Sequence, residues 1–361
     1  MDILNVQITF VLIWINLAVE SLLPAMTEPT PPKGPTPSAA PRRVLLLGAT
    51  GTIGRATARA LVQRGHDVVC FVRPRGTISS GSTLEGATVR FGHVTDPQSL
   101  RTDGVRGERF DVLVSCLASR TGVPADAWAI DHRAHLAALE VAREAGVTHM
   151  VLLSAICVQK PRLAFQHAKL AFEQALVESS LTYSIVRPTA YFKSLSGQID
   201  RVRRGKPFLL FGDGTLTACK PISDGDLGRY IASCLDDASL HNRVLPIGGP
   251  GEAITPRQQG EHLFRLLGRP PRFKHVPLRL LDGIVAAAGL LGRIVPPLAS
   301  KAELARIGRY YATESMLVLD QATGRYSSAA TPSTGTETLF DHYARLIRSE
   351  VASDLGDHAV F

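Results

Sequence analysis

A glycine-rich turn near residue 50 carries the clearest chemical signal in the sequence. A short apolar run ends at Leu47, three glycines follow with the spacing G-x-x-G-x-x-G, and a helical pattern begins directly after them. Glycine permits a tight turn and lets backbone N–H groups approach a pyrophosphate, to which the helix N-terminus adds the positive end of its dipole. The turn therefore predicts a dinucleotide site whose ligands include Gly48, Thr50, Gly51, Thr52, Ile53 and Gly54.

The residues after the second apolar run indicate which dinucleotide is bound. NAD sites commonly place Asp or Glu there to accept the ribose hydroxyls. This chain has no carboxylate at that point and instead has Arg73 and Arg75. Because a guanidinium binds phosphate through two parallel hydrogen bonds, we expect NADPH, with Arg73 on the 2′-phosphate; the alternative is a solvated loop arginine. Asp96, after the third apolar run, would either face the adenine or cap a helix.

The turn resembles that of the short-chain dehydrogenases, particularly their extended and atypical branches. That resemblance implies a catalytic pattern Ser … Tyr-x-x-x-Lys, and the matching positions here are Ser154, Phe165 and Lys169. In that superfamily the lysine binds the nicotinamide ribose and lowers the pKa of the tyrosine. Lys169 can keep the first role, unless it is a solvated helix residue, but Phe165 has no proton to donate.

A closer resemblance is carried by several longer strings between residues 43 and 348. These are LLSAICVQKPRLAFQHAKLAFEQAL, IVRPTAYFKSLSGQ, FGDGTLTACKPIS, IGGPGEAITP and IGRYYATESMLV. They resemble the NADPH-dependent divinyl chlorophyllide a 8-vinyl reductases of chlorophyll and bacteriochlorophyll synthesis. The resemblance implies that the C8 vinyl group of a divinyl chlorophyllide, or of a close tetrapyrrole precursor, is reduced to ethyl.

The absent tyrosine is compatible with such a reaction. Hydride added to the end of a conjugated vinyl group leaves negative charge spread over the macrocycle, which requires less local proton donation than an alkoxide does. The proton would come either from water or from a side chain near the nicotinamide. The candidate side chains are His167, Gln166 acting through a water, and Tyr191, and each of the three could instead have a purely structural role. The candidate catalytic residues are Lys169, Ser154 and His167.

The substrate of these reductases is a wide apolar plate with a propionate on its edge and its own magnesium, so no protein metal site is expected. The apolar wall is expected to come from Phe192, residues 278–298, Tyr310 and Tyr311. The candidate carboxylate partners are Lys193, Lys220 and Arg309.

Apolar strands alternate with helices from residue 43 to residue 187. This alternation predicts an α/β fold with a doubly wound parallel sheet, Rossmann-like and similar to extended short-chain dehydrogenases, with a smaller C-terminal substrate-binding region. The expected division is an N-terminal extension (1–42), the NADP-binding domain (43–245), the substrate-binding region (246–349) and a tail (350–361). Residues 278–298 are expected to form a packed helix or pocket wall rather than a membrane span, since charged residues interrupt their apolar run.

The segment before the glycine turn is apolar at first and then rich in proline. Polar residues interrupt its apolar part, and no positive charge precedes that part, so it fits neither a secretory signal nor a membrane helix well. We expect the natural chain to start at Met26, with a weak membrane anchor as the alternative.

The composition fits a globular protein with anionic ligands. The chain is 45% hydrophobic with a formal net charge of +8, and no nucleic-acid-binding motif accompanies its basic residues. Its five cysteines form no C-x-x-C pair, which favours a reducing compartment. We expect a cytoplasmic enzyme or one peripheral to the photosynthetic membrane. The alternatives are a non-catalytic NADP(H)-binding regulator or assembly factor, which retention of Lys169 disfavours, and a reductase of another conjugated alkene.

Overall fold

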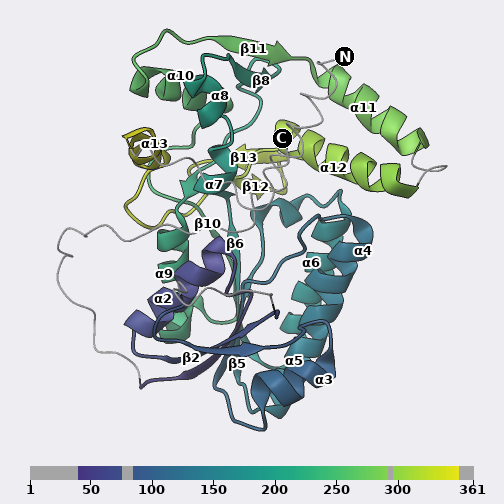
Figure 1. Ribbon diagram of the computed structural model, residues 1–361, viewed down its shortest axis with the longest axis vertical. Helices are drawn as coiled ribbons and strands as arrows, with labels where there is room; N and C mark the ends of the chain where they lie inside the picture. The colour runs from purple at the N-terminus through teal and green to yellow at the C-terminus, as the bar shows by residue number, and fades with distance from the viewer. Residues whose placement is uncertain (1–39, 75–83, 292–295, 349–361) are drawn as a thin grey trace.

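The computed structural model describes residues 40–74, 84–291 and 296–348, and seven parallel strands form its central sheet (Figure 1). The strand order is β10-β6-β5-β4-β1-β2-β3. The strands are β1 (Arg43–Leu47), β2 (Asp67–Val72), β3 (Thr88–Phe91), β4 (Val112–Ser115), β5 (His149–Leu153), β6 (Thr182–Pro188) and β10 (Arg243–Ile247). The order reverses between β1 and β4, and ligands of such sheets bind at the carboxyl ends of the strands at this point. Three features of the sequence analysis lie outside the described residues: the expected start at Met26, the side chain of Arg75, and the tail 350–361.

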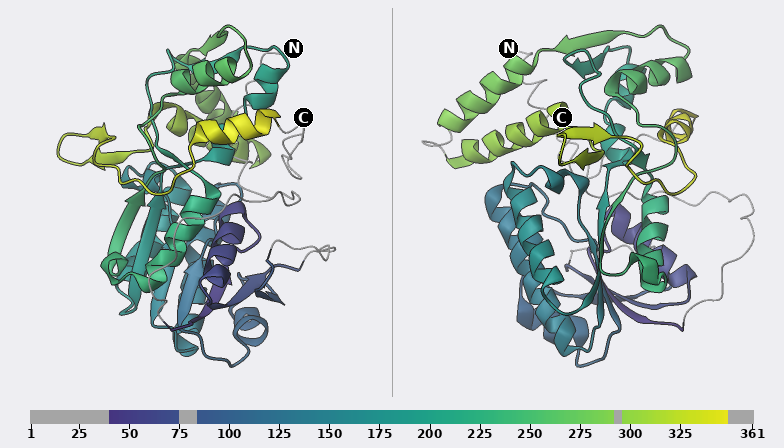
Figure 2. Two further views of the ribbon diagram at one scale, coloured as in Figure 1. Left: turned by 90° about the vertical axis from the view of Figure 1, so that its left-hand side faces the viewer. Right: turned by 180° about the vertical axis from the view of Figure 1, so that it is seen from behind.

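Helices cover both faces of this sheet, which explains why its strands are continuous apolar runs (Figure 2). One face carries α2 (Thr52–Gln63) and α9 (Asp224–Asp236). The other carries α3 (Pro97–Ser99), α4 (Pro124–Ala127), the π-helical segment η2 (Trp128–Ala134), α5 (His135–Glu144) and α6 (Ala164–Val177). The predicted doubly wound fold is confirmed.

A smaller region lies beyond the carboxyl ends of the strands (Figure 1). Its strands pair as β7 (Ala190–Tyr191) with β9 (Pro221–Ile222), β8 (Phe208–Phe211) with β11 (Phe273–Val276), and β12 (Val318–Asp320) with β13 (Arg325–Ser327). Its helices are α7 (Phe192–Leu195), α8 (Ile199–Arg203), α10 (Pro256–Leu266), α11 (Leu278–Leu291), α12 (Pro296–Thr313) and α13 (Leu339–Arg348). Residue 245, the expected boundary, lies within β10 of the main sheet, and β8 before it pairs with β11 after it.

The apolar stretch 278–298 is two helices rather than a single packed helix. α11 ends at Leu291, and α12 begins at Pro296 and packs against α11. Proline lacks a backbone N–H but is tolerated in the first turn of a helix, so Pro296 and Pro297 begin the second helix instead of closing the first. Among the described residues, no helix combines the length and the apolar character needed to cross a bilayer.

Candidate active site

Two cavities adjoin at the carboxyl edge of the sheet, where the strand order reverses. The first, of about 120 Å³, is lined by the glycine turn and by residues after β2, β3 and β4. The second, of about 220 Å³, is lined by residues after β4, β5 and β6 together with α6 and α12. Residues 117–120, which follow β4, line both cavities. The two cavities therefore adjoin along this segment.

The glycine turn is closed tightly by its own backbone. Gly48 has a φ of 75°, and a Cβ on it would lie 2.5 Å from the carbonyl carbon and oxygen of Cys116. A Cβ on Gly54 would lie 2.1 Å from the Gly48 carbonyl oxygen, so neither position accepts a side chain without a backbone shift. The Gly51 N–H donates to that same oxygen at 3.1 Å.

The free face of this turn fits a pyrophosphate. Thr50 and Gly51 line the first cavity, and Thr52 and Ile53 begin α2, whose first N–H groups have no partner within the helix. The Arg55 guanidinium donates to the Thr50 carbonyl at 2.8 Å and holds the turn in place.

The two residues expected at the ribose end lie in different surroundings. Arg73 follows β2 and lines the first cavity beside the glycine turn. Asp96 is not among the residues that line it, and its Oδ1 accepts the Gln98 N–H at 2.9 Å as the cap of α3. The geometry thus favours the capping role for Asp96 and keeps Arg73 as the phosphate candidate.

Phe165 and Lys169 lie one turn apart on α6 and both line the second cavity. The Lys169 Nζ lies 3.0 Å from Oδ1 of Asp131, whose side chain is fully buried. Asp131 also accepts the Ser119 N–H at 3.2 Å and the Ser119 hydroxyl at 2.5 Å. A buried ion pair therefore holds Lys169 at the cavity. The alternative, a lysine solvated on the helix surface, does not fit this geometry.

Ser154 also lines the second cavity, but its hydroxyl is already committed. It donates to the buried carboxylate of Glu173, which is in turn paired with Arg187. A hydroxyl that gives its only proton to a carboxylate is poorly placed to donate that proton to a substrate.

His167 does not fit its expected catalytic role. Its side chain is exposed and it is not among the residues that line the second cavity. Gln166 is buried, accepts the Leu163 N–H at 3.0 Å and donates to the Cys157 carbonyl at 3.2 Å, so it caps the start of α6. A helix rotates successive side chains by about 100°, so neighbours of Phe165 on the chain leave the face that it shares with Lys169.

A neutral histidine, unnoticed in the sequence, lies behind the Lys169–Asp131 pair. His135 is buried, with Nε2 2.8 Å from the Ser115 hydroxyl and Nδ1 2.9 Å from the Ile130 carbonyl. Burial, reinforced by the charge of Lys169, lowers the pKa of His135 to about 4. His135 therefore adds no positive charge beside the Lys169–Asp131 pair at neutral pH.

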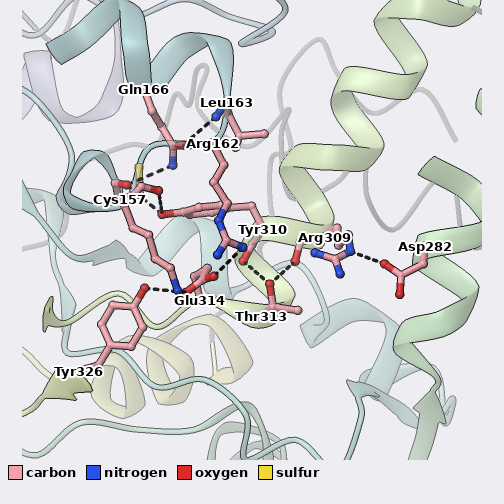
Figure 3. A network of polar contacts seen from close by, with 11 residues as sticks. Cys157, Arg162, Leu163, Gln166, Asp282, Arg309, Tyr310, Thr313, Glu314 and Tyr326 are labelled. Atoms are coloured by element: carbon pink, nitrogen blue, oxygen red, sulfur yellow. Dashed lines mark hydrogen bonds and ion pairs between the residues drawn. The ribbon is translucent and has the colours of Figure 1, made fainter. Parts of the chain in front are cut away.

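The end of α12 is fastened to the loop after β5 by a polar network (Figure 3). The Glu314 carboxylate, almost fully buried, pairs with Lys160 at 2.7 Å and with Arg162 at 3.0 Å. The Tyr310 hydroxyl donates to the carbonyls of Cys157 at 2.9 Å and of Lys160 at 3.0 Å. These contacts fix α12 so that Ile307 and Tyr311 form a wall of the second cavity.

A third cavity of about 90 Å³ extends this space into the smaller region. It shares four lining residues with the second cavity, namely Ala190, Ser194, Tyr311 and Met316. Its remaining wall is largely apolar, with Leu195, Phe208, Phe211 and Leu216 among the residues that line it. The combined space suits a broad apolar ligand.

The cations expected to face a substrate carboxylate lie elsewhere. In the described part of the chain, Lys193, Lys220 and Arg309 line none of the three cavities. Lys220 donates to the Thr331 carbonyl at 3.2 Å, and Arg309 pairs with Asp282. Arg120, which no spacing in the sequence singled out, lines both the first and the second cavity.

Comparisons with known proteins agree with this geometry. Residues 48–238 match a family of NAD(P)H-binding domains. The divinyl chlorophyllide a 8-vinyl-reductase of Oryza sativa subsp. indica is 49% identical over 331 residues, which are 88% of this chain and 82% of the relative. The enzyme of the same name from Zea mays is 47% identical over 93% of this chain and 88% of the relative. Among solved structures, an NADPH-dependent quinone oxidoreductase of Escherichia coli, complexed with NADPH, has a TM-score of 0.60 at 18% identity and covers 84% of this chain and 99% of its own. The chain is an NAD(P)H-binding oxidoreductase and belongs to the family of divinyl chlorophyllide a 8-vinyl-reductases.

Proposed function

We propose that this protein reduces the C8 vinyl group of divinyl chlorophyllide a to ethyl with NADPH. The balanced reaction adds one hydride and one proton to the vinyl group and yields NADP⁺. The observation that carries the proposal is the row of adjoining cavities, with shared lining residues, that runs from the glycine turn to the apolar space around Phe165 and Lys169. The plant relatives that bear this activity in their names support the choice of substrate.

NADPH is the cofactor because of the charge at the ribose end. Arg73 lines the first cavity, and among the described residues that line it there is no Asp or Glu. When bound, the cofactor supplies the hydride, and the protein supplies placement and electrostatics. Lys169, held by Asp131, lies in the second cavity where the nicotinamide ribose would be anchored.

The second and third cavities suit the substrate. Their walls are mostly apolar, as a chlorin plate requires, and the exposed Arg120 provides a cation for a propionate at the rim. The relatives are named as chloroplastic. For this chain we propose a role in chlorophyll synthesis, in the cytoplasm or peripheral to a photosynthetic membrane.

The test is direct turnover of the pigment. Purified protein with NADPH and divinyl chlorophyllide a should shift the pigment absorption to shorter wavelength, because one conjugated double bond is lost, and mass spectrometry should find two added hydrogen atoms. NADH in place of NADPH is the matched control and should react more slowly. Binding of NADPH without any change in the pigment would instead support a non-catalytic NADP(H)-binding protein.

A further inference from the structure

Reduction of a vinyl group needs a proton as well as a hydride, and the superfamily's usual donor is absent at Phe165. Another side-chain acid near the substrate would have to come from the walls of the second cavity. The residues that line it include four aliphatic hydroxyls with identified acceptors, each of which gives its proton elsewhere. Ser119 donates to Asp131, Thr121 to Asp126, Ser154 to Glu173, and Thr189 to the Lys220 carbonyl.

Tyr191 is different from these groups. It is half-buried, lines the second cavity, and its hydroxyl makes no hydrogen bond to any residue that the structure describes. It ends β7, the short strand that pairs with β9 through Ile222, so its backbone is fixed although its hydroxyl has no acceptor in the described part of the chain.

The neighbours of Tyr191 place it between the cofactor turn and the substrate space. It is within electrostatic range of Cys116, whose backbone touches the glycine turn, and of Cys157, which lines the second cavity. Burial first, and then these thiols and Asp224, raise the pKa of Tyr191. The phenol therefore keeps its proton until a stronger base forms beside it.

The rival acids in the same cavity are less suitable. The Tyr311 hydroxyl lies 3.7 Å from the Cys157 Sγ, toward the loop after β5. Burial raises the pKa of the Cys157 thiol as well, and that residue is buried although it lines the cavity. Ser194 is an alcohol, which is a weaker acid than a phenol.

We propose that Tyr191 is the proton donor of the reaction. The proposal rests on the proposed function. Hydride reaches the terminal carbon of the vinyl group, the electron pair of the double bond moves to the carbon next to the macrocycle, and that carbon takes the proton from the Tyr191 O–H. The phenolate that remains regains a proton from solvent, so the step closes without any further reactant.

The test is Tyr191→Phe, which removes the oxygen and keeps the ring. A positioned general acid contributes about 10²–10⁴-fold, so kcat should fall by about 10²-fold or more. The isotope pattern should also reverse: the parent shows a primary effect from deuterated NADPH, whereas the variant, which has to take its proton from water, shows a solvent isotope effect and a smaller cofactor effect. The affinity for NADPH, measured by fluorescence without turnover, should not change.

Two further variants make the result decisive. Tyr183→Phe makes the same change at the opposite end of β6 from the cavity and should leave kcat and both isotope effects as in the parent. Tyr311→Phe tests the rival phenol. If Tyr191→Phe keeps the parent rate and isotope pattern, or if Tyr311→Phe alone reverses that pattern, Tyr191 is not the donor. A parent protein that binds NADPH but leaves the pigment unchanged overturns the proposed function, and this inference with it.

Discussion

The Lys169–Asp131 pair can be broken in two ways that separate its contribution to folding from its contribution to the reaction. Lys169→Ala leaves the Asp131 carboxylate fully buried without its cation. Breaking one side of a buried pair costs about 3–5 kcal/mol. Because Ser119 keeps two hydrogen bonds to that carboxylate, we expect the lower end, about 3 kcal/mol of unfolding free energy.

The double variant Lys169→Met with Asp131→Asn removes both charges and keeps similar volumes. Replacement of a whole buried pair is often neutral or stabilising, so the unfolding free energy should return to the parent value or exceed it. Activity should not return, because the ammonium that we propose as the anchor of the nicotinamide ribose is still missing, and a misplacement of about 1 Å can cost on the order of 10²-fold in rate.

The assay is urea unfolding followed by circular dichroism without cofactor, together with pigment reduction at saturating NADPH. The reasoning about the ion pair fails if Lys169→Ala unfolds at the same urea concentration as the parent. The reasoning about the reaction fails if the double variant, stably folded, reduces the pigment at the parent rate.

Three more predictions follow from single positions. Arg73→Asp should weaken NADPH binding by about tenfold to a hundredfold, as loss of a charge-assisted contact of about 1.5–3 kcal/mol requires, and fluorescence titration that finds an unchanged preference over NADH would exclude Arg73 as the phosphate ligand. Gly54→Ala should destabilise the protein by about 1–3 kcal/mol and weaken NADPH binding, because the new Cβ meets the Gly48 carbonyl oxygen at 2.1 Å; thermal unfolding at the parent temperature would contradict this. Burial raises the pKa of Asp224 from 3.8 to about 6, so the folded protein favours the neutral carboxyl and loses stability as the pH rises from about 4 to about 6. Asp224→Asn should accordingly be more stable than the parent by roughly 1–3 kcal/mol at pH 7 and equal to it below about pH 4, and a stability difference that does not vary with pH would refute the assignment.

The sequence was sufficient for the sheet and for the cofactor turn because both depend on local patterns. Strands covered on both faces are continuous apolar runs, and helices with their own stop signals separate them. The turn at Gly48 and Gly54 is recognisable because close backbone approach leaves room for no other residue. The long strings shared with the vinyl reductases are local as well, and the family assignment made from them is confirmed.

The candidate catalytic residues depended on contacts that no local pattern contains. Lys169 was identified by its spacing, but its partner Asp131 lies on a different helix, and only packing brings the two side chains together. The sequence could not distinguish the exposed His167 from the cavity-lining Phe165, two positions away on the same helix.

The smaller region was the least predictable part of the described chain. Strand β8 pairs with β11 across a long intervening segment. The position of α12 at the second cavity depends on the pairing of Glu314 with Lys160 and Arg162 and on the hydrogen bonds of Tyr310. A sequence specifies such contacts through the free energy of the whole fold, in which apolar burial and paired charges from distant segments are satisfied together. For this protein, the residues proposed to hold the cofactor were therefore evident from the chain. The proposed proton donor, Tyr191, is distinguished only by the tertiary structure, in which four hydroxyls of the same cavity have acceptors and that of Tyr191 has none among the described residues.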